Sequence, residues 1–185
     1  MSDITFKVVS NRDERFIAAI KAHYNGSSGP PYGKKLSLEI LENDKHRGWI
    51  GLGEPSFKLA PRRRLGLYDA RPLAQTVSCF IYRLDSSGNV PASTILKTWH
   101  ETAEFWWFIS YKWRPVHWET MVDPTKILEK QNPGACFRRA GYRPLGYTTG
   151  RSARRPEGHG KGEPRIWVDD TPKLVLYRGP LHRCK

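Results

Sequence analysis

The pattern of apolar and polar residues along the chain predicts strands separated by a few helices. Eight segments combine β-branched or aromatic residues with the period-2 alternation of a half-buried strand, or with a continuous apolar run. They are residues 4–9, 36–40, 48–53, 75–83, 118–122, 143–149, 165–168 and 173–177. Residues 75–83 form the most continuous run, as expected of a central strand that is buried on both faces.

Apolar residues at helical spacing predict two main helices. The first covers residues 15–21 and follows Asn11 or Asp13, whose side chains suit an N-cap. The second is long, covers about residues 92–111, and has Ser93 as its expected N-cap.

The polar side of the long helix carries His100, Glu101 and Glu104. His100 and Glu104 are one helical turn apart, which is a spacing that two metal ligands can use. A protein zinc site needs further ligands at a diagnostic spacing, and none follows in the sequence. We therefore predict no metal site.

The stretch 117–151 reads as strand, loop, short helix and strand. The strand at 118–122 ends at Asp123, and the short helix over 134–140 ends at Gly141, where a left-handed residue is expected. Ligands in open α/β sheets bind beyond the carboxyl ends of strands, so Asp123 is a candidate site residue. The alternative role for its carboxylate is to cap the loop that follows.

Composition and charge favour a globular protein that binds a polyanion. The chain has 185 residues, 38% of them apolar, and a net charge of +13 from 31 Lys and Arg against 18 Asp and Glu. DNA is the first candidate partner, and a basic surface without a partner is the alternative. No apolar run reaches the roughly 20 residues of a membrane span, and the N-terminus shows no secretory signal. Three widely spaced cysteines fit the reducing cytoplasm.

Two segments concentrate the positive charge. Residues 58–71 carry five basic residues against one acidic residue, and residues 151–162 form a basic, glycine-rich loop. Loops of this kind hold phosphates without reading sequence, although a solvated face has the same composition. The candidate DNA-binding residues are Lys58, Arg62, Arg63, Arg64, Arg151, Arg154 and Arg155.

Other candidate residues lie at strand ends and at the start of a loop. Ser78, Glu119 and Asp123 lie on or next to predicted strands, and Asp123 could orient or deprotonate an amino group. His23 and Tyr24 begin the loop 23–31, rich in Gly, Ser and Pro, which either closes over a pocket or merely connects two elements. The sequence contains no nucleophile elbow, P-loop or dinucleotide-binding fingerprint.

The order of the predicted elements matches the GNAT-like acyltransferase fold, an α/β (α+β) arrangement with a central mixed sheet flanked by helices. Residues 1–185 are expected to form one such domain, with a basic C-terminal extension from about 151 to 185. That fold separates two central strands and places the cofactor pyrophosphate on a glycine-rich turn that begins the long helix. The corresponding turn, 85–92, lacks the Arg/Gln-x-x-Gly-x-Gly/Ala pattern, and Asp85 would repel a phosphate. The turn therefore argues against a usual coenzyme A site.

Three motifs carry a resemblance to a known family. They are WETMVDP at 118–124, GACFRRAGY at 134–142 and GYTTGR at 146–151. Together they resemble the LETFVD…GTCYRAANW…GxTxGR signature of the first subunit of Druantia anti-phage systems. The HYNG segment at 23–26 and the GEPSFKLAPR segment at 53–62 agree with this resemblance.

The short-helix motif and the acidic strand end also resemble phage Mom proteins. Those GNAT-like enzymes add a carbamoylmethyl group to the exocyclic amino group of adenine in DNA, which protects phage DNA from restriction. Asp123 matches the strand-end Asp of Mom, Ser78 matches the Ser of the central strand, and Cys136 and Arg138 fall on the helix motif. The chain departs from both families at Cys79, where they tend to have Arg.

The resemblance implies one of two functions. The first is a Mom-like transferase acting on double-stranded DNA, with Asp123 orienting the amino group, Ser78 and Tyr24 assisting, and an acyl-CoA-like or glycine-derived donor. The second is a non-catalytic DNA-binding subunit of a Druantia-like defence system. An acyltransferase acting on proteins or small molecules is a third hypothesis, but it leaves the positive charge unexplained.

Overall fold

A computed structural model describes eight segments of the chain. They are residues 3–23, 33–55, 76–82, 88–126, 132–148, 151–154, 166–169 and 171–179.

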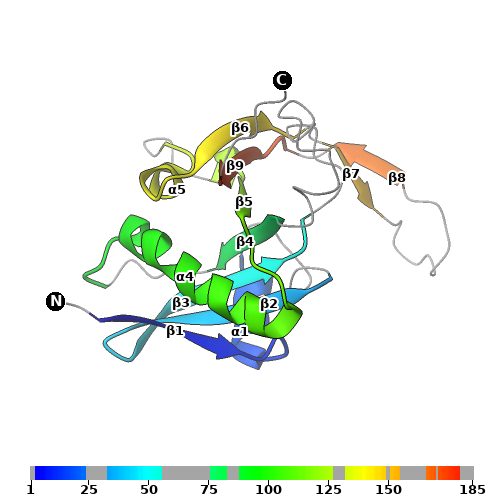
Figure 1. The fold of residues 1–185 in the computed structure, drawn as a ribbon. Coiled ribbons are helices and arrows are strands. Elements are labelled where there is room, and N and C mark those ends of the chain that lie inside the picture. The colour runs from blue at the N-terminus through cyan, green and yellow to red at the C-terminus, as the bar shows by residue number, and fades with distance from the viewer. Residues whose placement is uncertain are drawn as a thin grey trace, which may run out of the picture.

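Seven strands form one mixed sheet, in the order β1-β2-β3-β4-β5-β9-β6 (Figure 1). Their bounds are β1 Ile4–Val9, β2 Lys35–Glu42, β3 Lys45–Gly53, β4 Thr76–Tyr82, β5 His117–Val122, β6 Arg143–Tyr147 and β9 Leu174–Arg178. The central pair β4–β5 is parallel, and the other neighbouring pairs of this sheet are antiparallel. A separate antiparallel pair joins β7, Arg151–Arg154, to β8, Ile166–Asp169. Each predicted strand is therefore present, with ends within three residues of the prediction.

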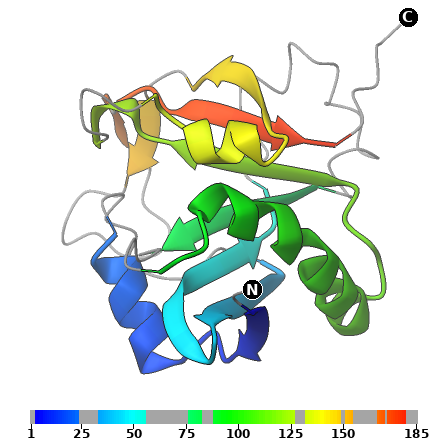
Figure 2. The same ribbon diagram turned by 90° about the vertical axis from the view of Figure 1, so that its left-hand side faces the viewer.

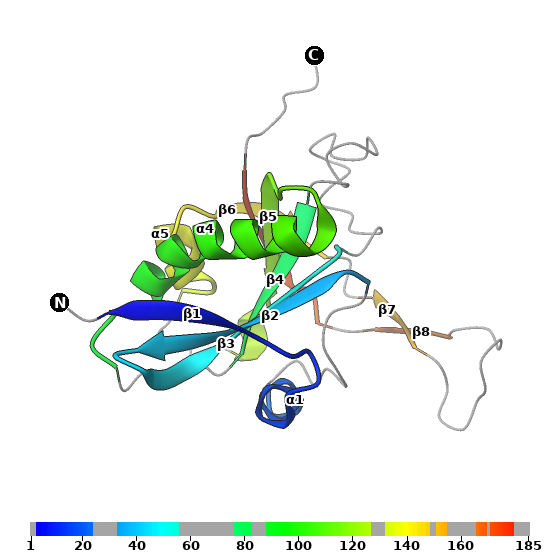
Figure 3. The same cartoon turned by 60° about the horizontal axis from the view of Figure 1, so that its bottom comes forward.

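The helices cover both faces of the large sheet. Figure 3 shows α1, Glu14–Lys21, on the face opposite to α4, Ala92–Tyr111, and α5, Ala135–Arg139. Figure 2 shows α5 beside α4. A short 3-10 helix, η1, covers Pro124–Lys126.

The two faces of the sheet have separate cores. The α4 face holds the larger one, in which the indoles of Trp99 and Trp107 are fully buried against alternate residues of β2 to β5 and β9. Phe16 and Ile20 of α1 pack on Trp49 to form the smaller one. Because alternate residues of a strand point to opposite faces, this assignment fixes which face each strand residue occupies.

Several local predictions are confirmed and others are wrong. Asp13 is the N-cap of α1, because its Oδ1 accepts hydrogen bonds from the N–H groups of Arg15 at 2.9 Å and Phe16 at 3.2 Å. The N-cap of α4 is Pro91 rather than Ser93, and the Pro91 side chain makes no capping hydrogen bond. His100 was predicted on the polar side of α4 but is only 7% exposed, because the sheet and α5 enclose it.

The segment 151–162 was predicted to be a loop, yet it begins with the strand β7. Strand β7 has the sequence Arg-Ser-Ala-Arg, which lacks the period-2 apolar signal of a half-buried strand. No helix among the described residues is long and apolar enough to cross a membrane.

Candidate functional site

The two central strands separate part of the way along their length. β4 and β5 pair through Thr76 with His117, Val77 with Trp118, and Ser78 with Glu119. Beyond that last pair, β4 continues to Tyr82 and pairs only with β3 among the described strands, while β5 continues along β9. Such a separation of the central strands is expected of the GNAT-like fold. The pair Ser78–Glu119 lies at the point where the two strands begin to separate.

The side chains of this last pair meet on the face that carries α1. Ser78 Oγ donates a hydrogen bond of 2.5 Å to Glu119 Oε1. The two residues are 3% and 1% exposed, so this hydroxyl–carboxylate contact is buried.

A second hydrogen-bonded pair extends the same polar face. Tyr177 lies opposite Glu119 in the β5–β9 register, and its hydroxyl is hydrogen-bonded to His117 Nδ1. Burial raises the pKa of Tyr177 to about 12, the nearby Arg143 guanidinium opposes that rise, and the Glu119 carboxylate adds to it. The phenol is therefore protonated at neutral pH. A carboxylate, a hydroxyl, an imidazole and a phenol on one face are groups that can move a proton.

The opposite face carries a buried polar chain of a different character. Arg178 Nη1 donates to His100 Nδ1 at 2.7 Å, and His100 Nε2 lies 2.9 Å from the Tyr142 hydroxyl. Because Arg178 can only donate, Nδ1 must accept, and the imidazole proton lies on Nε2. The Tyr142 hydroxyl also lies 3.4 Å from Cys79 Sγ.

Two members of this chain, His100 and Cys79, are kept in their neutral forms. Burial lowers the pKa of His100 to about 3, and the charge of Arg178 lowers it further. Burial raises the pKa of Cys79 to about 12, although the hydrogen bond with Tyr142 opposes the rise. Cys79 is thus a protonated thiol at neutral pH and lacks the thiolate that a nucleophile needs.

Asp123 has a local structural task. Its Oδ1 accepts hydrogen bonds from Thr125 N at 3.0 Å and from Thr125 Oγ1 at 2.7 Å, which caps the turn after β5. Asp123 comes four residues after Glu119, a separation of about 13 Å along an extended chain. The structure thus joins Ser78 to Glu119, while the Oδ1 of Asp123 is engaged at the strand end.

The two candidates from the short-helix motif, Cys136 and Arg138, make structural contacts around α5. Cys136 is half-buried and packs against the larger core, and its pKa is raised chiefly by burial. Arg138 Nη2 donates to Asn132 Oδ1 and to the Pro133 carbonyl, both at 2.7 Å, and so fastens the loop before α5.

The remaining predicted site residues are only partly described. His23 follows α1 and is half-buried, and burial lowers its pKa, whereas a hydrogen bond with the backbone of Ile81 on β4 opposes this. Arg151 and Arg154 belong to β7, for which only the backbone is described. Tyr24, Lys58, Arg62, Arg63, Arg64 and Arg155 lie outside the described residues.

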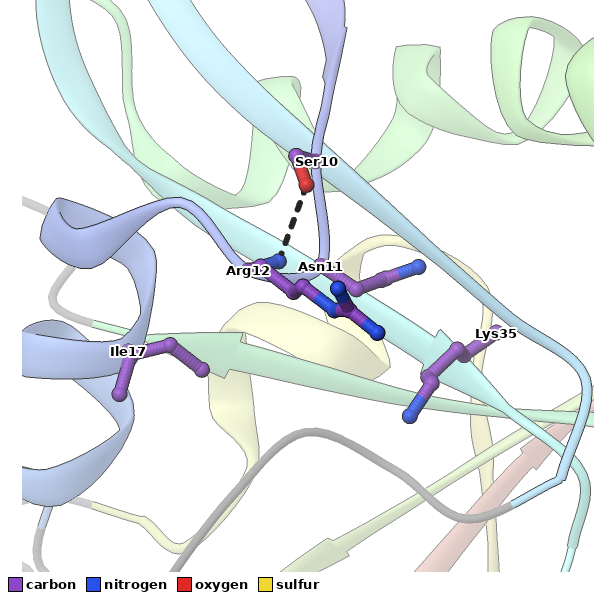
Figure 4. Close-up of a pocket in the computed structure, with 5 residues that line it drawn as sticks. All are labelled: Ser10, Asn11, Arg12, Ile17 and Lys35. Carbon is purple, nitrogen blue, oxygen red and sulfur yellow. Dashed lines mark hydrogen bonds between the residues drawn. The ribbon is translucent and has the colours of Figure 1, made fainter.

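An open cavity lies beside the start of α1, and the sequence analysis did not identify it (Figure 4). Its volume is about 690 Å³. It is lined by Ser10, Asn11, Arg12, Ile17 and Lys35, and Arg12 and Lys35 extend toward it from different elements. Two cations and two small polar side chains suit an anionic group.

The chain matches no known family model and no curated protein sequence, but its fold is shared with solved structures. An aminoglycoside acetyltransferase in complex with coenzyme A has a TM-score of 0.56 and 8% identity, over 96% of this chain and 95% of that chain. An acetyltransferase from Bacillus subtilis in complex with CoA has a TM-score of 0.52 and 10% identity, over 97% and 100%. An IAA acetyltransferase from Bacillus cereus has a TM-score of 0.51 and 10% identity, over 95% and 98%.

Proposed function

We propose that this protein is a DNA-modifying transferase of the Mom type, which acts on the exocyclic amino group of adenine in DNA. The chain has the GNAT-like acyltransferase fold, a seven-stranded mixed sheet flanked by helices, with its central parallel strands separating. The single observation that carries the proposal is the buried Ser78–Glu119 pair at the point where β4 and β5 separate. Fold alone does not determine the reaction, whereas this pair provides a candidate base.

The pair suits the acceptor side of a group transfer to an amino group. As the amino nitrogen bonds to the carbon of the donated group, the leaving group departs with the electron pair of the broken bond. The nitrogen must then lose a proton. Ser78 Oγ accepts that proton and passes its own to Glu119, with which it is already hydrogen-bonded at 2.5 Å. Glu119 thus takes the role of base, and Asp123 shapes the end of the strand.

Charge supports DNA as the acceptor. The chain carries a net charge of +13, and residues 138–185 contribute 12 basic and four acidic residues, 12 − 4 = +8. Such an excess attracts the phosphate backbone of double-stranded DNA independently of sequence. The cavity with Arg12 and Lys35 offers one place for a phosphate. The adenine must leave the base stack to reach a buried pair, as in other enzymes that act on a base.

Mass spectrometry of nucleosides from plasmid DNA tests the proposal. The host expresses wild type, Glu119→Gln or Ser78→Ala, with Glu101→Gln as control because Glu101 is an exposed carboxylate on α4. We expect a heavier deoxyadenosine with wild type and the control, and a loss of at least about 100-fold with Glu119→Gln, the size typical of removing a general base. Unmodified adenine in all samples, with folded protein, would refute the transferase proposal.

A second candidate is a non-catalytic DNA-binding subunit of a Druantia-like system. Two residues that the resemblance marks as functional favour this candidate, because both make local structural hydrogen bonds. Asp123 Oδ1 accepts from Thr125 N, and Arg138 donates to Asn132 in the loop before α5. Both candidates predict DNA binding that weakens steeply with salt. Only the transferase predicts that Glu119→Gln removes the modified nucleoside while duplex affinity at a fixed salt concentration stays within a few-fold.

A further inference from the structure

A carboxylate from another strand lies on the N-terminal end of α4. Glu42, the last residue of β2, accepts hydrogen bonds at its Oε1 from the backbone N–H groups of Asn89 and Val90, both at 3.1 Å. These residues directly precede Pro91, the N-cap of α4. Asn89 and Val90 lie in the turn before the helix, so their N–H groups are near the positive end of the α4 dipole, where an anion is stabilised. Here the chain supplies the anion itself.

An arginine encloses this carboxylate from the other side. Arg47 Nε lies 3.0 Å from Glu42 Oε2, an ion-pair distance, although the N–H does not point at the oxygen. Each side chain is only 5% exposed. Arg47 Nη2 donates to the Val90 carbonyl at 3.2 Å, whereas Nη1 is buried without a hydrogen-bond partner among the described residues.

Gly88 shows how completely the two side chains fill this space. A Cβ added at Gly88 would lie 2.1 Å from Glu42 Oε2 and 2.2 Å from Arg47 Cζ. Both distances are far inside van der Waals contact, and both atoms belong to buried groups. The turn therefore approaches the ion pair so closely that a side chain at residue 88 would displace Glu42 or Arg47.

The GNAT-like fold implies a coenzyme A donor whose pyrophosphate lies at this helix start, and the residues present do not fit it. Two of the amides that would hold the pyrophosphate are bonded to Glu42. The carboxylate would also repel a second anion in a buried setting, where charges are screened weakly. The turn itself lacks the usual basic or amide residue before its glycine.

We propose that Glu42 is a built-in replacement for the donor pyrophosphate, so that this protein takes a donor without a pyrophosphate at α4. The inference concerns the donor alone and stands whether or not DNA is the acceptor. It also predicts a latent anion site, because removal of the carboxylate leaves two free amides and the unsatisfied Arg47 facing the same space.

Thermal unfolding and calorimetric titration with coenzyme A and with inorganic pyrophosphate test the proposal. The proteins are wild type, Glu42→Ala and the control Glu39→Ala. Glu39 is also a buried carboxylate of β2, 4% exposed, but it lies on the α1 face against His46 and Arg15. We expect both alanine variants to melt below wild type, and only Glu42→Ala to regain several degrees of Tm when a probe is present at about ten times its Kd.

Two results would overturn the proposal. One is wild-type protein that binds coenzyme A as tightly as Glu42→Ala does. The other is a folded Glu42→Ala variant that gains no response to either probe. If Glu42→Ala does not fold, Glu42→Ser takes its place, because its short side chain keeps a polar group but leaves the amides of Asn89 and Val90 free and removes the repelling charge. It is then expected to bind the probes at least tenfold more tightly than wild type, and equal affinity would contradict the proposal.

Discussion

The stability of the protein below neutral pH is expected to depend on His100. This imidazole is 7% exposed, its Nδ1 accepts a hydrogen bond from Arg178, and its Nε2 donates to Tyr142. A second proton would place a positive charge next to the guanidinium in a buried setting. The folded protein therefore holds the pKa of His100 at about 3, first because of burial and then because of Arg178.

The size and sign of the effect follow from the difference between the folded and unfolded chains. Histidine in an unfolded chain has a pKa of about 6.5. Between about pH 6.5 and about pH 3, His100 is protonated in the unfolded chain but not in the folded protein. The free energy of unfolding therefore decreases as pH falls. The slope approaches about 1.4 kcal/mol per pH unit, which gives about 2 kcal/mol lost between pH 7.5 and 5. Above the unfolded pKa the contribution is fully present.

Urea unfolding of wild type and His100→Gln at pH 7.5, 6.5, 5.5 and 5.0 measures this loss. The glutamine variant is expected to be less stable at pH 7.5, because its packing and hydrogen bonds differ, but to lose about 2 kcal/mol less by pH 5. Titrations shared by both proteins cancel in the difference. Parallel curves for His100→Gln and wild type would refute the buried, neutral imidazole.

Two further predictions concern packing and thiol reactivity. Gly88→Ala is expected to lower the free energy of unfolding by about 2–4 kcal/mol, because the new methyl group overlaps Glu42 and disturbs its buried ion pair, and urea unfolding checks this. In a Cys184→Ser background, Cys79 is expected to react with a thiol reagent at pH 7.5 only as fast as the protein unfolds, since burial raises its pKa to about 12. Mass spectrometry of the labelled peptides measures that rate, and prompt labelling of folded protein would contradict the burial.

The strands were predictable because a two-residue period leaves a local signal, whereas contacts between strands leave none. Ser78 and Glu119 were both candidates, yet nothing local indicates that they form a pair. Their contact depends on the parallel register of two strands whose paired residues are 41 positions apart. A shift of one residue in that register would turn one of the two side chains to the opposite face. Asp123 was ranked above Glu119 because its position at a strand end is visible in the sequence.

The Glu42–Arg47 pair was not predicted. Glu42 directly precedes a polar turn at Asn43 and Asp44, whose φ angles are 49° and 63°. A glutamate at the edge of a polar turn gives no sign of being buried. The sequence does contain an indirect indication in the turn that Glu42 contacts. This turn, before the long helix, lacks the residues that usually accompany a bound pyrophosphate.

The two halves of the proposed site differ in what the chain itself places there. On the α1 face, the separated strands still present a buried hydroxyl–carboxylate pair. At the start of α4, the anion-binding amides are occupied by the chain itself. If Glu42 fills the donor site as proposed, the protein either transfers a group from another kind of donor or binds its partner without reaction. The first case requires that the modified nucleoside depends on Glu119 and that the wild-type protein does not bind coenzyme A. The second requires DNA binding without any modified nucleoside, so the two experiments together separate the cases.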